Sequence, residues 1–219
     1  MGLCLAMVIV SSFAFAQDNY NTYGKSEAEI VAMGWTKWND FYTNKTSGST
    51  VDMVTANEIY GAVLQHRNDR MLKGLTDEKS VATIKELRTL LTDYAGSAVN
   101  MAENRSGGGT IWHIFYAGIL PETESVLYAV MGGKSDKVKH ARVSDVEKKL
   151  ADLAHLNAKK GSVDVLPEFK PGDAAKSLAT MKKDLKKIAR IAAEFDREGS
   201  DQVLQFCIRY ADTATGNLN

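Results

Sequence analysis

His113 is the residue whose surroundings most suggest a cofactor or ligand site. It lies in a segment, residues 111–120, that is apolar nearly all round. A helix there is expected to bury the imidazole, and burial favours its neutral form. Trp112 and Tyr116 would then line a pocket with His113, which could bind a small ligand or an axial haem iron. The alternative is a core histidine that donates a hydrogen bond to a backbone carbonyl.

The rest of the sequence adds little support for a metal or a haem. No second histidine shares this segment, and the absence of a Cys-x-x-Cys-His motif excludes a c-type haem. A non-covalent haem held by His113 and a methionine stays open. Asp152 and His155 lie three residues apart, but their helical projection places both opposite an apolar stripe. We therefore predict no metal site and no bound cofactor.

Arg67 is a candidate anion-binding residue. It falls inside the apolar arc of the helix predicted for residues 51–72, between Val63 and Met71. A buried guanidinium needs a partner, because an unpaired buried charge costs several kcal/mol. That partner could be an anionic ligand or a carboxylate of another helix. The side chain could instead extend past the helix into water.

Four cations form a basic ridge in the last third of the chain. Lys183, Lys186, Lys187 and Arg190 are spaced i, i+3, i+4 and i+7, on the face opposite the apolar stripe of the same predicted helix. The ridge is either a solvated surface or a docking site for an acidic protein or a polyanionic envelope surface, including anionic lipid headgroups. No aromatic residues interleave it, so no nucleic-acid partner is expected.

Motifs of well-known enzyme classes are absent. The chain lacks HExxH, CxxC, GxSxG and SxxK sequences. Residues 132–135, Gly-Gly-Lys-Ser, match the end of a phosphate-binding loop, but Tyr128 occupies the position where that loop needs its first glycine. These absences favour a non-catalytic protein.

Hydrophobic spacing predicts an all-α protein, a bundle of about six to seven helices. Apolar residues recur every three or four positions, and strand-like alternation is scarce. The segments 143–160 and 173–197 are expected to form a C-terminal antiparallel hairpin. Pro121 is expected to open a new helix, with Glu124 in its favourable first turn. The other predicted helices are 26–42, 51–72, 77–103, 111–120 and 200–213.

Composition places the chain among globular proteins. It has 219 residues, of which 44% are hydrophobic and 25% charged. The formal net charge is zero, but residues 134–190 hold 15 basic and 8 acidic side chains, a local net charge of +7. Two cysteines exclude a disulfide-rich scaffold.

The N-terminus has the pattern of a cleaved secretory signal peptide. Residues 3–16 are uncharged and mostly apolar, and the run ends in Ala14-Phe15-Ala16, a sequence that signal peptidase accepts. The run is shorter than the ~20 residues that a membrane-spanning helix needs. We therefore expect residues 1–16 to be removed, leaving residues 17–219 as one helical domain that is periplasmic or extracellular. No transmembrane segment is expected in the mature chain.

Three functions compete on these observations. The first is a secreted or periplasmic, non-catalytic helical bundle that acts by binding or assembly with an envelope or extracellular partner. The second is a carrier of haem, metal or a small ligand, with a pocket around His113. The third is an enzyme with an unrecognised site, although helical-bundle enzymes usually show several inward Glu and His residues.

Overall fold

The protein is all-α, as predicted. The computed structural model describes residues 20–106, 108–158 and 171–215, and these contain eight helices and no strand. The predicted signal peptide, residues 1–16, lies outside the described residues. The helices are α1 (Glu27–Met33), α2 (Trp35–Lys45), α3 (Thr50–Gly74), α4 (Glu78–Ser106), α5 (Ile111–Val130), α6 (Val143–Ala158), α7 (Pro171–Ala192) and α8 (Arg197–Thr213).

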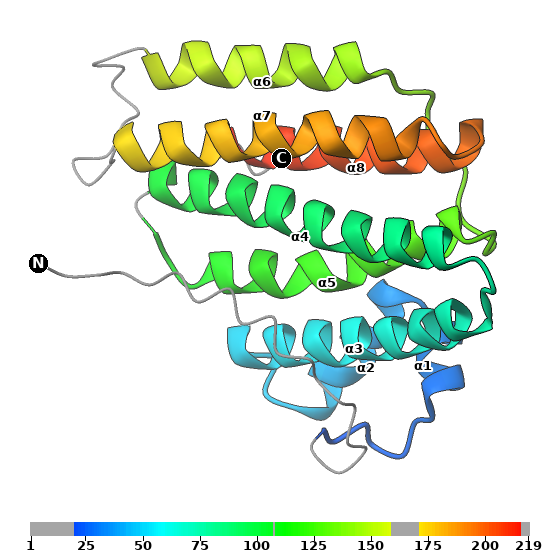
Figure 1. The fold of residues 1–219 in the computed structure, drawn as a ribbon. Helices are drawn as coiled ribbons and strands as arrows, with labels where there is room; N and C mark the ends of the chain where they lie inside the picture. Colours follow the sequence, from blue (N-terminus) through cyan, green and yellow to red (C-terminus); the bar gives the residue numbers. More distant parts are fainter. Residues whose placement is uncertain (1–19, 107, 159–170, 216–219) are drawn as a thin grey trace, which may run out of the picture.

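The helices stack in layers that follow the chain only loosely (Figure 1). α6 forms one edge, α7 and α8 lie beneath it, α4 and α5 occupy the middle, and α3 with α1 and α2 closes the other side. α6 and α7 run in opposite directions, so the predicted antiparallel pair is confirmed. α7 packs more extensively on α4 than on α6. The hairpin is therefore part of the bundle and not an appendage.

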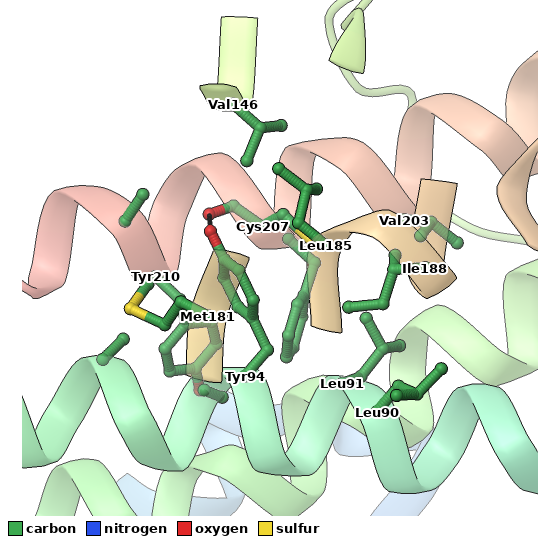
Figure 2. Packing of buried hydrophobic residues seen from close by; sticks show 14 of the residues in the cluster. Leu90, Leu91, Tyr94, Val146, Met181, Leu185, Ile188, Val203, Cys207 and Tyr210 are labelled. Carbon is green, nitrogen blue, oxygen red and sulfur yellow. Dashed lines mark hydrogen bonds between the residues drawn. The ribbon is translucent and has the colours of Figure 1, made fainter. Parts of the chain in front are cut away.

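Two hydrophobic cores hold the layers together. The larger core is formed by the five helices α4, α5, α6, α7 and α8. It buries the apolar stripe predicted for α7, which includes Met181, Leu185 and Ile188. Figure 2 shows these side chains packed between α4 and α8. Within this core, the Tyr94 hydroxyl donates to the backbone carbonyl of Cys207 at 3.1 Å. A buried hydroxyl thus finds an acceptor without breaking the apolar packing.

The smaller core joins α1, α2 and α3 and is rich in aromatic side chains: Trp38 and Tyr42 are buried in it, and Tyr20, Trp35 and Phe41 pack against it. Trp38 is fully buried, and its indole N–H donates to the Ala56 carbonyl at 2.8 Å. The helix predicted over 26–42 is divided into α1 and α2 by Gly34, whose φ of 75° lies in the left-handed region. This break lets α2 turn its aromatic side chains onto α3.

The expected break at Pro121 does not occur. α5 runs through the proline as one helix of 20 residues. A proline inside a helix removes one backbone hydrogen bond and costs about 3 kcal/mol, but α5 is packed on α3, α4 and α8 and this burial offsets the loss. At Gly61 on α3, an added Cβ would come within 2.9 Å of Leu120 and Pro121, so the absent side chain permits the close approach.

Candidate functional site

The prediction that His113 is buried is wrong. His113 is exposed, as is its neighbour Ile111, in the first turn of α5. The neighbouring helices cover one side of this end of α5 and leave the other to solvent, so an apolar sequence does not bury every position. The haem or ligand alternative rested on that burial and loses its support.

Trp112 and Tyr116 are both less exposed than His113, and each contacts other side chains. The Trp112 side chain is buried, with its ring 5.2 Å from that of Phe115. Tyr116 is half-buried and donates from its hydroxyl to Glu103 on α4 at 3.1 Å. Burial, followed by the negative charge of Glu103, raises the pKa of Tyr116 well above its usual value. These two side chains therefore attach α5 to the bundle.

Arg67 contacts the aromatic ring of Tyr128, a partner that the sequence did not predict. Its guanidinium carbon lies 3.6 Å from the centre of the Tyr128 ring on α5, the geometry of a cation–π contact. Its Nε donates to Asn68 Oδ1 at 3.3 Å. Burial lowers the pKa of Arg67, and Tyr128, Tyr60 and Glu124 oppose that change. Of the predicted alternatives, the structure is nearest to pairing with another helix, through an aromatic ring.

Next to Arg67 lies a polar cluster made of Asn68, Asp69, Arg88 and Glu124, of which Asn68 and Glu124 are buried. The Glu124 side chain is fully buried. Asn68 Nδ2 donates to the Glu124 backbone carbonyl at 2.7 Å and to Oε2 at 2.8 Å. Arg88 approaches both carboxylate oxygens, with Nε 2.8 Å from Oε1 and Nη2 3.1 Å from Oε2. Arg88 Nη1 also donates to Asp69 Oδ1 at 2.8 Å.

Within this cluster, Arg88 and Glu124 form a charged pair in which each group opposes the effect of burial on the pKa of the other. Burial raises the pKa of Glu124, while Arg88 and Asn68 oppose that rise. Burial also acts to lower the pKa of Arg88, but Glu124 and Asp69 outweigh it and hold that pKa above its ordinary value. The cluster connects α3, α4 and α5 and leaves no charge of the pair unmatched. Its chemistry suits a structural role.

The sequence suggested that Glu124 lies in the first turn of a helix, and this prediction is wrong. Because α5 continues through Pro121, Glu124 lies in the middle of the helix, where the dipole gives it no stabilisation. The available signal was Glu124, one of two acidic residues in a helix that is otherwise mostly apolar. Such a residue predicts a buried partner, although it does not say which one.

The basic ridge lies on the surface, as predicted. Lys183, Lys186, Lys187 and Arg190 are all exposed on α7. None of them makes an ion pair within 4.0 Å in the described part of the chain. Lys176 and Lys182 are exposed on the same helix, which brings the number of cations to six. Asp173 is the only exposed acidic residue among the described side chains of α7.

A cavity that no sequence pattern indicated lies where α2 and α3 approach α8 across α5. Its volume is about 260 Å³. Three aromatic side chains line it, one from each of three helices: Trp35, Phe115 and Tyr210. Glu122 and Arg209, which also line it, form an ion pair with Nη2 3.2 Å from Oε2. His113 does not line this cavity, but its neighbour Ile114 does.

Within the described residues, no group of three or more His, Cys, Asp or Glu side chains could hold a metal ion. No helix of that same part combines the length and the apolar composition needed to cross a membrane. Comparisons with protein-family models, with curated proteins and with solved structures found no match.

Proposed function

We propose that the protein is an exported, non-catalytic helical bundle that binds a polyanionic partner through the exposed face of α7. The observation that carries the proposal is the group of six exposed cations on one helix, four of them in the ridge and none of those four neutralised by an ion pair in the described residues. Exposed charges of one sign raise the local concentration of an oppositely charged partner and speed its association.

The six cations are distributed along α7, so they are suited to contact a partner that carries an extended anionic surface. Lys176 and Arg190 are fourteen positions apart, which corresponds to about 21 Å along a helix at 1.5 Å per residue. The opposite face of α7 is fixed in the core by Met181, Leu185 and Ile188. The cations are therefore presented on a rigid support, which reduces the entropy lost on binding.

The carboxyl groups of Asp184 and Asp93 offset the positive charge of the exposed face of α7 only in part. Asp184 is buried between α7 and its neighbours, and burial, with a contribution from Asp93 on α4, raises its pKa. Lys183 and Lys187 oppose that rise, so they interact with this carboxyl at a distance.

Charge reversal on α7 tests the proposal. The triple substitution Lys183→Glu, Lys186→Glu and Lys187→Glu should abolish binding to poly-L-glutamate, a probe of acidic protein surfaces, and leave the circular dichroism spectrum unchanged. Binding by the native protein should weaken steeply with salt, because exposed charges are screened over about 10 Å at 0.1 M. Vesicles containing phosphatidylglycerol, used in parallel, would separate a lipid surface from an acidic protein.

A matched control carries the same change in net charge elsewhere. Lys37, Lys73 and Lys85 are exposed on α2, α3 and α4. Reversing these three to Glu should leave binding to the probe within about twofold of the native value. Equal loss in both triple variants would mean that only net charge matters, and would contradict a site on α7.

Export is the second component of the proposal. The support is the apolar run that ends at Ala16, which predicts a mature protein beginning at Gln17. Mass spectrometry of the protein recovered from its native cells would measure the N-terminus. An intact Met1 on protein from the cytoplasm would refute export and remove the envelope and extracellular partners with it.

A further inference from the structure

The cavity between α2, α3, α5 and α8 has the composition of a small-molecule site. Ligand pockets in proteins are mostly apolar with a few convergent polar groups, and those for drug-sized molecules measure about 300–1,000 Å³. At about 260 Å³, this cavity suits a smaller molecule. Its aromatic walls come from Trp35 on α2, Phe115 on α5 and Tyr210 on α8. It is separate from the basic face of α7.

Asn57, a polar residue that lines the cavity, already uses its side-chain amide in hydrogen bonds within the protein. Asn57 Oδ1 accepts a hydrogen bond from the Trp35 indole N–H at 2.7 Å, and Asn57 Nδ2 donates to the Ile114 carbonyl at 3.4 Å. These two bonds fix the orientation of the Trp35 ring against α5. The asparagine thus shapes the cavity, and the charged groups are left to determine which ligand it accepts.

The charged groups of the cavity are one carboxylate and one guanidinium. Glu122 and Arg209 contact each other at 3.2 Å, and their side chains are 27% and 51% exposed, so solvent reaches both. Burial raises the pKa of Glu122, and Arg209 opposes that rise. A guanidinium has five N–H donors, and one of them, on Nη2, donates to Glu122. Arg209 therefore keeps donors for a second carboxylate.

From this geometry we infer that the cavity binds a small zwitterion with an apolar body, such as a hydrophobic amino acid. The ligand ammonium would contact Glu122 and the faces of the aromatic rings, which attract cations. The ligand carboxylate would contact Arg209. A zwitterion supplies a partner to both protein charges, whereas a singly charged ligand pairs with one of them and competes with the existing ion pair.

A series of probes that share one ring tests this inference. The probes are L-phenylalanine, phenethylamine, 3-phenylpropionate and 3-phenylpropanol, which carry a zwitterion, an ammonium, a carboxylate and no charge, with L-valine as a smaller zwitterion. Binding is measured by isothermal titration calorimetry, and by ligand-observed NMR where it is weak. At least one zwitterion should bind tenfold or more tightly than each of the other three probes.

Substitutions in the cavity separate its two charges. Arg209→Gln should remove the advantage of L-phenylalanine over phenethylamine, and Glu122→Gln should remove its advantage over 3-phenylpropionate. Gly118→Leu places a branched side chain beside Trp35, since an added Cβ there meets the ring at 3.5 Å, and should abolish binding. Lys149→Gln, in the exposed pair with Asp212, is the control and should change nothing.

Two results would overturn the inference. One is the absence of binding by both zwitterions at 10 mM. The other is binding of the uncharged alcohol as tightly as the zwitterions, which would make the cavity a general apolar site. Arg209 is half-exposed, so Arg209→Gln is expected to fold and keeps the test decisive even if Gly118→Leu does not. The α7 triple reversal should leave zwitterion binding intact, which distinguishes this site from the docking face.

Discussion

Breaking the Arg88–Glu124 pair should be among the most destabilising polar substitutions in the chain. Removing one partner of a buried ion pair costs about 3–5 kcal/mol, because the other charge is left without compensation. Glu124→Gln keeps the shape of the side chain and an acceptor for Asn68. Arg88, whose side chain is 18% exposed, would retain Asp69 at 2.8 Å. We therefore expect a loss at the lower end of that range, about 3 kcal/mol.

Arg88→Met reverses the situation and adds a pH dependence. It leaves a fully buried carboxylate with the Asn68 amide as its remaining hydrogen-bond donor in the cluster. Burial already raises the pKa of Glu124, and the loss of Arg88 removes the main opposing group. A carboxyl whose pKa is raised in the folded protein binds its proton more tightly there, so its penalty grows as the pH rises above the ordinary value. Arg88→Met should cost less stability at pH 5 than at pH 8.

The assay is urea unfolding followed by circular dichroism, with the free energy taken from the linear dependence on denaturant. Replacing both residues by Met should restore most of the loss, because a buried ion pair and an apolar pair of similar volume are often close in stability. The control is Lys149→Met, which removes a pair whose side chains are 43% and 51% exposed and should cost less than about 1 kcal/mol. If the single variants at Arg88 and Glu124 were as mild as this control, the description of a closed, buried cluster would be wrong.

Three further predictions concern packing. Leu185→Asp should destabilise by more than about 3 kcal/mol in the same assay, since it removes a core side chain and buries a charge. Lys186→Asp on the exposed face should cost about 0.5 kcal/mol, and equal effects of the two substitutions would contradict the assigned faces of α7. Gly61→Ala should destabilise by about 1–3 kcal/mol through the close contact with α5, and Gly96→Ala, with open space around its Cβ position, should stabilise by about 0.5–1 kcal/mol. The Cys207 thiol is buried and burial raises its pKa, so it should react with a thiol reagent only as fast as the protein unfolds; rapid labelling of Cys207 in the native state, located by peptide mass spectrometry, would argue against the packing of α8.

The local pattern of the sequence predicted the faces of α7 well. The stripe that includes Met181, Leu185 and Ile188 is buried, and the ridge that includes Lys186 is exposed. Both follow from the 3.6-residue period of a helix, which brings residues three and four apart to one side. Such patterns depend only on neighbours in the chain. They remain valid whichever helices pack against the apolar side.

The wrong predictions concern positions where tertiary packing decided whether a side chain is buried or where a helix begins. His113 lies in an apolar segment and was expected to be buried, but the neighbouring helices do not cover its side of α5. Pro121 was expected to begin a helix, but packing on three helices keeps α5 continuous. Neither coverage by a distant helix nor the compensation of a lost hydrogen bond can be read from the spacing of residues along one segment.

The sequence by itself determined that the protein is helical and which sides of its long helices are apolar. The tertiary structure decided which polar groups meet. Glu124 pairs with Asn68, 56 positions away, and with Arg88, 36 positions away, and Glu122 pairs with Arg209, 87 positions away. Helical periodicity gives the direction of a side chain but not the helix that faces it. The partners of buried charges, and the cavity between four helices, depend on the order in which the helices stack.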